Sequence, residues 1–132
     1  MLARVVLPIP GKSSIKIWPS TNDYKLKRLY QEASLLFLPL IDVTACNTIL
    51  EAMSSGLAII TNDVGGNPSY LAGTKNILTP PNKYDELIDA TIELLNDEMK
   101  LETLGGLSRR KSLQYEWSEV AKKLESFYKS GN

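Results

Sequence analysis

The sequence contains no histidine. This absence removes the commonest general base and the commonest metal ligand of proteins from the whole chain. There is a single cysteine, Cys46, so an internal disulfide is excluded, and the chain fits a reducing compartment. With no histidine to activate its thiol, Cys46 is predicted to fill space in the fold and not to act as a nucleophile.

Net charge and long apolar segments are lacking as well. The 15 basic and 15 acidic side chains cancel, so no overall field attracts nucleic acid or an anionic membrane. The longest strongly apolar run, 33–41, is too short to cross a bilayer and contains Pro39. The opening stretch MLARVVLPIPGK lacks the apolar segment and cleavage site of a signal peptide. We therefore expect a cytoplasmic protein that does not bind nucleic acid.

The chain has the size and composition of one globular domain. Its 132 residues are enough to bury a core. Hydrophobic residues make up 43% and charged residues 23%, which is the balance of a soluble protein. No internal repeat or low-complexity tract divides the sequence. We therefore expect a single domain over residues 1–132.

Short β-rich runs alternate with longer segments of helical periodicity. Residues 97–113 have a helical pattern that we expect to be broken at Gly105 and Gly106. The alternation favours an α/β fold in which a parallel sheet is covered by helices on both faces. Strands are expected at Arg4–Leu7, Ile15–Trp18, Leu35–Leu40, Leu57–Thr61 and Asn76–Thr79, and helices at Tyr24–Ala33, Asn47–Ser55, Pro68–Leu71, Tyr84–Asn96 and Trp117–Tyr128.

Two loops stand out because ligands bind at the carboxyl ends of the strands in an open parallel sheet. The first, IDVTACN, leads from the apolar run 35–40 into the helix that follows. The second, NDVGGNP, carries Gly65 and Gly66, which let the backbone approach a ligand closely. The helix start offers unpaired N–H groups and the positive end of a dipole. The small side chains of Thr44 and Cys46 leave room there for a phosphate or carboxylate.

Each of these features also has a structural explanation. Thr48 and Glu51 have the Thr-x-x-Glu spacing of a capping box, in which case Glu51 would hold only the start of its helix. Asp42 would form an Asx-turn within its loop. Gly65 and Gly66 would form an ordinary turn. From the residues alone, both interpretations remain open at all three places.

Residues 29–71, LYQEASLLFLPLIDVTACNTILEAMSSGLAIITNDVGGNPSYL, closely resemble the carboxyl-terminal, donor-binding domain of the family 4 retaining glycosyltransferases. That family has the GT-B fold, so the resemblance implies a Rossmann-like doubly wound parallel sheet followed by carboxyl-terminal helices. The similar segments keep the family's order and spacing over about residues 15–128. They are Leu29–Ser34, Leu35–Pro39, Leu50–Gly66, Ile77–Pro81 and Trp117–Tyr128.

The resemblance implies roles for several residues of this stretch. Glu51 matches the second glutamate of the family's Glu-x7-Glu motif, which contacts the ribose of the nucleotide. The diphosphate of the sugar nucleotide would be held at the start of the same helix, where unpaired N–H groups favour an anion. Asp63, Gly65 and Gly66 match the loop that lines the family's cleft. The residues at the helix start are Thr44, Cys46, Asn47 and Thr48.

The first glutamate of the motif is replaced in this sequence. It should stand eight positions before Glu51, where the chain has Val43. Some members of the family carry a loop of the Asp-Ala-Thr-Ala-Asn-Asn type here, and DVTACN resembles that variant. The resemblance therefore makes Asp42, next to Val43, the candidate for the catalytic contact with the sugar.

The family's donor domain usually begins with a strand, a Gly-Arg turn and a Lys-Gly pair whose cations neutralise the diphosphate. This sequence does not contain that unit, and no motif supports Arg4 or Lys12 as a substitute. The family's acceptor-binding amino-terminal domain is missing as well. We therefore expect a donor-binding half that is inactive in isolation, because a displacement needs both substrates held in line.

The resemblance also implies partners. They are a UDP-, GDP- or ADP-sugar, with no metal ion as cofactor, and the missing amino-terminal domain or a partner chain. Self-association through the face that this domain would cover is a further hypothesis, as is a peripheral position of the full-length form at the membrane. The alternatives are a degenerate nucleotide- or partner-binding module without catalysis, and a sugar-nucleotide epimerase of the same fold. Those epimerases rely on histidines, which this chain lacks.

Overall fold

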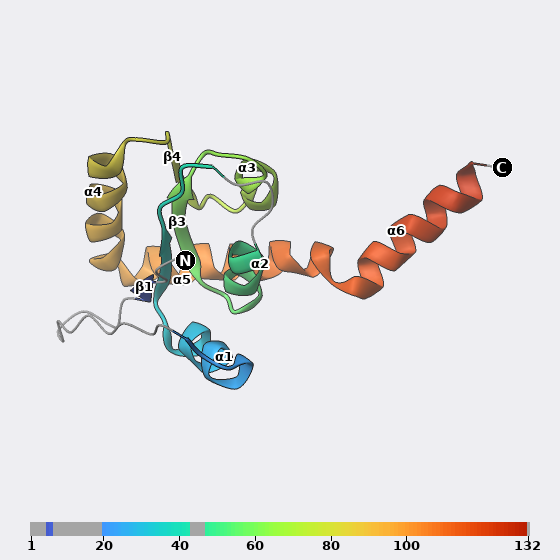
Figure 1. The fold of residues 1–132 in the computed structure, drawn as a ribbon, viewed down its shortest axis with the longest axis horizontal. Helices are drawn as coiled ribbons and strands as arrows, with labels where there is room; N and C mark the ends of the chain where they lie inside the picture. Colours follow the sequence, from blue (N-terminus) through green and yellow to red (C-terminus); the bar gives the residue numbers. More distant parts are fainter. Residues whose placement is uncertain (1–4, 7–19, 43–46, 132) are drawn as a thin grey trace.

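The structure is a computed structural model that describes residues 5–6, 20–42 and 47–131. In this part of the chain the strands form one four-stranded sheet in the order β1-β2-β3-β4 (Figure 1). Strand β3 pairs in parallel with β2 on one side and with β4 on the other. The predicted α/β fold with a parallel sheet is thus confirmed. The strands are β1 Val5–Val6, β2 Leu35–Leu38, β3 Ala58–Asn62 and β4 Ile77–Thr79.

The edge strand β1 differs from the prediction in its direction. It pairs antiparallel with β2, with Val5 opposite Phe37. Antiparallel edge strands are common on sheets that are otherwise parallel. An apolar run in a sequence shows that a strand exists, but it does not show which way that strand points. The predicted strand Arg4–Leu7 corresponds to β1, whereas the strand predicted at Ile15–Trp18 lies outside the described residues.

Helices connect the strands and cover them. The side chain of Asn22 accepts a 2.8 Å hydrogen bond from the backbone N–H of Lys25 and so caps the start of α1. Gly56 takes a φ of 72° just after α2 and ends that helix. The helices are α1 Asp23–Glu32, α2 Asn47–Ser54, α3 Asn67–Leu71, α4 Tyr84–Leu95, α5 Glu98–Ser112 and α6 Trp117–Ser130, with a short 3₁₀ helix, η1, at Leu113–Tyr115.

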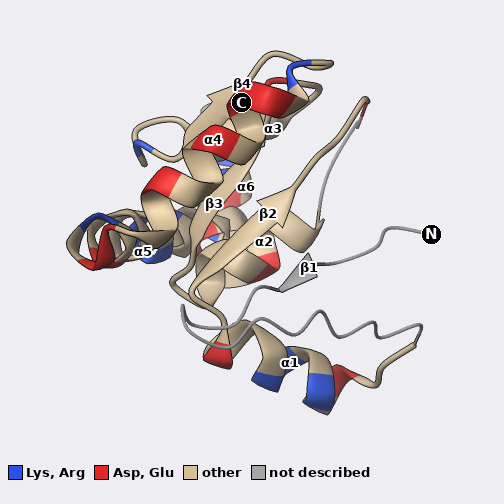
Figure 2. Cartoon of the chain, turned by 90° about the vertical axis from the view of Figure 1, so that its left-hand side faces the viewer, with Lys and Arg blue, Asp and Glu red and all other residues tan. Residues whose placement is uncertain are grey.

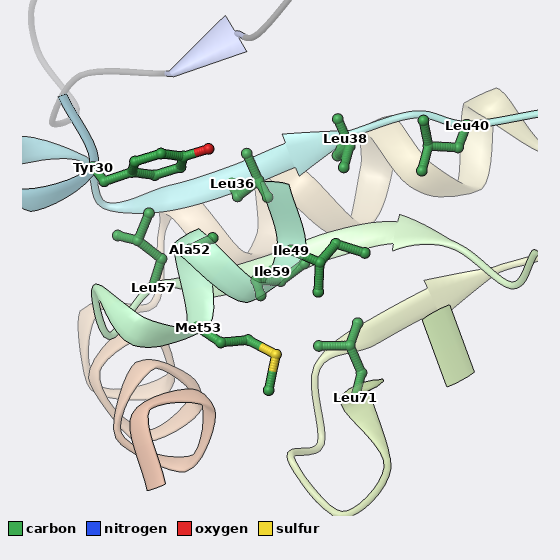
Figure 3. Packing of buried hydrophobic residues seen from close by; sticks show 10 residues of the cluster. All are labelled: Tyr30, Leu36, Leu38, Leu40, Ile49, Ala52, Met53, Leu57, Ile59 and Leu71. Carbon is green, nitrogen blue, oxygen red and sulfur yellow. The ribbon is translucent and has the colours of Figure 1, made fainter. Parts of the chain in front are cut away.

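Buried side chains fill both faces of the sheet. On one face, Leu36, Leu38 and Ile59 belong to a cluster that also contains side chains of α1, α2 and α3 (Figure 3). On the other face, Leu35 and Ile60 belong to a second cluster with side chains of α4 and α5. Successive residues of β2 and β3 therefore alternate between two apolar layers, which is the pattern of a parallel sheet covered on both faces.

Helix α5 is continuous, so the predicted break at Gly105 and Gly106 is wrong. Gly105 is buried where α5 crosses the turn between α2 and β3, and a Cβ atom there would clash with the carbonyl oxygen of Gly56. Gly106 is exposed, and a Cβ atom there would meet nothing within 4 Å. The first glycine thus allows two segments of backbone to touch, a reason that the local sequence does not reveal.

Helix α6 extends away from the sheet and its covering helices (Figure 1). None of its residues is buried. Its apolar stripe, which consists of Trp117, Val120, Leu124 and Phe127, is exposed, with Trp117 at 87% and Phe127 at 73%. Neither α6 nor any other helix in the described ranges has the length and apolar character needed to cross a membrane.

We predict that Gly105→Ala lowers the free energy of unfolding by about 1–3 kcal/mol, because the added methyl group must push α5 away from Gly56. Denaturation with urea followed by circular dichroism measures this change. Gly106→Ala is the matched control in the same helix. We expect it to raise the free energy of unfolding by about 0.5–1 kcal/mol, the usual difference between alanine and glycine in a helix. Equal effects at the two positions would show that the contact with Gly56 is not tight.

Candidate functional site

The carboxyl ends of three strands are held together by one side chain, that of Asn62. Asn62 is the last residue of β3 and has no exposed surface. Its Oδ1 accepts a 2.7 Å hydrogen bond from the backbone N–H of Leu40, which follows β2. Its Nδ2 donates to Thr79 Oγ1 at 3.1 Å and to the carbonyl oxygen of Pro80 at 3.2 Å, at the end of β4. The loops at this edge of the sheet therefore start from fixed backbone.

Two of the predicted acidic residues lie in these loops. Asp42 follows β2 and Asp63 follows β3, and both side chains are exposed. The backbone N–H of Asp63 donates to the carbonyl oxygen of Thr79 at 2.8 Å, so the start of its loop is tied to β4. Gly65 has a φ of 53°, which a residue with a side chain rarely adopts, and Gly66 is the N-cap of α3. This geometry fits the simple turn that was one of the two explanations for the glycine pair.

The start of α2 is described from Asn47 onward. Asn47 is the first residue of the helix and is exposed, whereas Thr44 and Cys46 lie outside the described residues. Thr48 is 4% exposed and lies inside the first turn. It therefore does not occupy the N-cap position, and the capping-box explanation of Glu51 is wrong. Glu51 has another contact: its Oε2 accepts a 2.7 Å hydrogen bond from the hydroxyl of Tyr30.

A groove of about 860 Å³ lies between α1, α2 and the segment that joins α5 to α6. Tyr30 lines it from α1, Asn47 and Glu51 line it from α2, and Tyr115 and Trp117 line it from the third side. This volume is in the usual range of small-molecule sites, roughly 300–1,000 Å³. The structure therefore brings two of the predicted residues, Asn47 and Glu51, into one candidate ligand site.

The other predicted residues that the structure describes are not among those that line the groove. Thr48 is buried behind it in the helix, and Asp42, Asp63 and the two glycines lie at the carboxyl edge of the sheet. The candidate site thus has two parts, the groove and that edge. Helix α2 connects them, since Asn47 stands at its start and Glu51 lies one turn further along.

Side chains of both charge signs border the groove. Asp23 and Lys27 come from α1, Glu51 from α2, and Glu116 directly precedes α6. Figure 2 shows acidic and basic segments next to one another along α1. The three carboxylates can accept hydrogen bonds from ligand hydroxyl groups, and the ammonium group of Lys27 can donate to a ligand acceptor. In the described part of the chain, no group of three or more His, Cys, Asp and Glu side chains is arranged to hold a metal ion.

The sequence did not indicate the aromatic walls of this groove. Tyr115 lies in the 3₁₀ segment, where no periodicity marks it, and its ring meets that of Tyr70 edge to face at 5.6 Å. Its hydroxyl donates to the carbonyl oxygen of Ser69 at 3.4 Å. Burial, and to a smaller extent Tyr70, raises the pKa of the Tyr115 phenol above its usual value of 10.0, so this hydroxyl remains a donor at neutral pH.

Comparison with known proteins gives the family. The model of the family described as Glycosyl transferases group 1 matches residues 4–97 of the sequence. The chain belongs to the group 1 glycosyl transferases. The predicted resemblance is thereby confirmed at the level of the family. The matched residues include β2, α2 and β3, and with them Asn47, Glu51 and Asn62.

Two curated relatives illustrate how this glycosyl transferase chain compares with longer proteins. Spore coat protein SA of Bacillus subtilis is 39% identical over 84 residues, which cover 59% of this chain and 22% of that protein. D-inositol 3-phosphate glycosyltransferase of Corynebacterium aurimucosum is 27% identical over 105 residues, which cover 79% of this chain and 25% of that protein. The chain thus spans about a quarter of the length of the curated relatives it matches.

A solved structure has a similar fold. Sucrose-phosphate synthase from Thermosynechococcus elongatus superposes with a TM-score of 0.72 at 23% sequence identity, over 84% of this chain and 29% of that one. At this identity the likeness concerns the fold. It agrees with the α/β architecture of the group 1 chain, in which the parallel strands β2, β3 and β4 are covered on both faces.

We predict that Asn62→Ala lowers the free energy of unfolding by about 2–4 kcal/mol, because it leaves the buried N–H of Leu40 without its acceptor and removes the donor to the buried Thr79 Oγ1. Urea denaturation of the two proteins measures the difference. Asn96→Ala is the control of the same residue type, since Asn96 is exposed and donates to the carbonyl oxygen of Ile92 in its own helix. We expect that control to change stability by less than about 0.5 kcal/mol. A loss at Asn62 no larger than at Asn96 would contradict the proposed role of this side chain.

Proposed function

We propose that this chain is the nucleotide-sugar donor-binding part of a retaining glycosyltransferase of the hexosyltransferase type, and that the groove receives the nucleoside of the donor. The joint position of Asn47 and Glu51 in the groove is the observation that supports the proposal most. Family resemblance assigns Glu51 to the ribose and Asn47 to the diphosphate. A nucleoside diphosphate has its ribose bonded to its diphosphate, so the residues that bind the two parts must line the same groove.

Donor binding in this proposal uses carboxylate and backbone groups, without a metal cofactor. The Glu51 carboxylate accepts hydrogen bonds from ribose hydroxyl groups. The diphosphate lies at the start of α2, beside Asn47, where unpaired backbone N–H groups and the helix dipole favour negative charge. Thr44, Cys46 and Thr48 belong to the same proposed subsite through the family resemblance.

The sugar of the donor belongs, in the same proposal, at the carboxyl edge of the sheet. Asp42 would contact the sugar, and Asp63 with Gly65 and Gly66 would form the wall of the cleft. The hydrogen bonds of Asn62 support this assignment, because they fix the starts of both loops relative to each other. The positive φ of Gly65 lets backbone come close to a ligand.

We propose that glycosyl transfer requires more of the enzyme than these 132 residues. The matched relatives are about three times as long, since 84 matched residues cover 22% of one and 105 matched residues cover 25% of the other. A displacement needs the acceptor held in line with the donor, and holding both reactants contributes several kcal/mol to catalysis. The isolated chain is therefore expected to bind a nucleotide and to transfer sugar at a very low rate.

A module that binds without catalysis is the second candidate. It is favoured by the replacement of the expected glutamate by Val43. The name of one relative, spore coat protein SA, refers to a spore structure and not to a reaction. In this case the groove would still hold a nucleotide, or α6 would serve mainly to contact a partner chain.

The exposed stripe of α6 is proposed to contact the remainder of a longer enzyme. Leu124 is 54% exposed and Phe127 73% exposed, and no described residue covers them. The greater length of the relatives supports this occupant, because a protein of that length has further residues to cover the stripe. In the isolated chain the same apolar stripe is free to meet a second copy, which gives weak self-association.

We predict that the purified chain binds one of UDP, GDP and ADP in calorimetric titration, and that Glu51→Gln weakens this binding at least about tenfold because a charged acceptor is lost. Glu102→Gln is the matched control. Glu102 is exposed on α5 and does not line the groove, so its substitution should leave the affinity unchanged.

Two outcomes of this titration would contradict the proposal. If the folded chain binds none of the three nucleotides, the donor-binding assignment fails. The function that then fits best is that of a module that binds a partner chain. If a nucleotide binds equally well to Glu51→Gln, the ligand does not use the Glu51 carboxylate, and the assignment of this residue to the ribose fails. The titrations contain EDTA, since the proposal includes no metal ion. Binding that requires Mg²⁺ in place of EDTA would overturn that part of the proposal.

We also predict that the wild-type chain shows a concentration-dependent mass in light scattering. The double variant Leu124→Ser/Phe127→Ser should be a monomer, because it replaces two of the four apolar side chains in the stripe of α6. Ile88→Ser is the control, since Ile88 is 47% exposed but belongs to α4. A wild-type chain that stays monomeric at high concentration would contradict self-association. Equal effects of the control and the double variant would show that α6 is not the contact surface.

A further inference from the structure

The hydrogen bond between Tyr30 and Glu51 joins the buried core to the groove. Tyr30 is 4% exposed and belongs to the same buried cluster as Leu36, Ala52 and Leu57 (Figure 3). Its hydroxyl donates to Glu51 Oε2 at 2.7 Å, and both residues line the groove. The donor of this bond is therefore fixed by core packing, while its acceptor belongs to the candidate ligand site.

We propose that Tyr30 is a positioning residue that orients the Glu51 carboxylate toward the ribose of a nucleoside diphosphate, so that discrimination between ribose and 2′-deoxyribose depends on the Tyr30 hydroxyl. The proposal rests on the proposed function of the groove. An ionised carboxylate has about four acceptor positions on its two oxygens. The bond from Tyr30 to Oε2 thus sets the direction of the group, and a carboxylate so held is still of the kind that accepts hydrogen bonds from a ligand.

The energetic reason lies in the flexibility of glutamate. A free glutamate side chain loses rotamer entropy when a ligand fixes it, and this loss weakens binding. In this chain a rigid partner holds the carboxylate before the ligand arrives. Two adjacent ribose hydroxyl groups can be recognised together only if the carboxylate has the right orientation. Loss of the Tyr30 hydroxyl should therefore affect ribose recognition more than binding of the rest of the nucleotide.

A purely structural role of the bond makes a different prediction. The two residues are 21 positions apart and tie α1 to α2. If that were the only role, Tyr30→Phe would lower the stability of the chain and leave the preference for ribose unchanged. The ratio of the dissociation constants of a 2′-deoxynucleotide and its ribonucleotide separates the two roles, because effects common to both ligands cancel in the ratio.

The test measures this ratio by calorimetry, with whichever of UDP, GDP and ADP binds and with its 2′-deoxy form. For the wild-type chain we expect the ribonucleotide to be preferred by about tenfold or more, the size of one hydrogen bond to a charged group. For Tyr30→Phe, which keeps the ring and its packing, we expect the preference to fall below about threefold. Tyr24→Phe is the control: Tyr24 is in the same helix but 72% exposed, and this variant should keep the wild-type ratio.

A double-mutant cycle tests whether Tyr30 acts through Glu51. Glu51→Gln alone should remove most of the preference for ribose. Adding Tyr30→Phe to it should change the ratio no further, because residues that act as one unit have non-additive effects. Additive effects of the two substitutions would contradict positioning, since each residue would then contribute independently.

The outcomes separate this inference from the proposed function. If the wild-type chain binds no nucleotide, the proposed function fails and the inference fails with it. If it binds a nucleotide with the expected preference and folded Tyr30→Phe keeps that preference, only the role of Tyr30 is overturned. If the wild type does not distinguish the two sugars, nucleotide binding stands, but the contact between Glu51 and ribose is overturned together with its positioning by Tyr30.

Discussion

The amide of Asn62 is the point on which the carboxyl edge of this sheet depends. A buried amide must find partners for one acceptor and two donors, and Asn62 finds them on the chain that follows β2 and at the end of β4. The loops that carry Asp42 and Asp63 both begin within two residues of these bonds. A buried polar group without a hydrogen-bond partner is costly. If one of the three strand ends moved away from Asn62, buried groups there would lose their hydrogen-bond partners. Both loops are thus attached to fixed backbone at the ends of the strands.

The groove depends on a second close contact, the crossing of α5 over Gly56. Leu104 packs with α4 on one face of the sheet, whereas Ser112, two turns later in the same helix, lines the groove on the other side. Helix α5 passes from one face to the other at Gly105, where its backbone touches that of Gly56. A side chain at Gly105 would push α5 outward and would displace Tyr115 with it. The shape of the groove is therefore set by a glycine that does not line it.

Much of the fold could be predicted because it follows from local patterns. The apolar runs gave β2 and β3, and Gly56 marked the end of α2. What the sequence could not provide are pairings between distant positions. Asn62 meets Leu40 across 22 positions, and Tyr30 meets Glu51 across 21. The same limit explains the errors: the direction of β1 and the continuity of α5 depend on what the segment packs against, and not on its own residues. In the candidate site, the Thr48 spacing suggested a cap because spacing alone does not fix where a helix begins.

Helix α2 links the two parts of the candidate site, and its position is fixed by packing. Ile49 and Met53 have no exposed surface and lie in the core beneath the helix. Asn47 and Glu51 are on the same helix, about 6 Å apart along its axis at 1.5 Å per residue. The core residues therefore determine where both polar residues stand relative to the sheet. If α2 turned about its axis to move Glu51, it would withdraw Ile49 from the core, which costs a few kcal/mol. Burial of apolar side chains thus holds the backbone of α2 in place, and the bond from Tyr30 orients the Glu51 carboxylate relative to it.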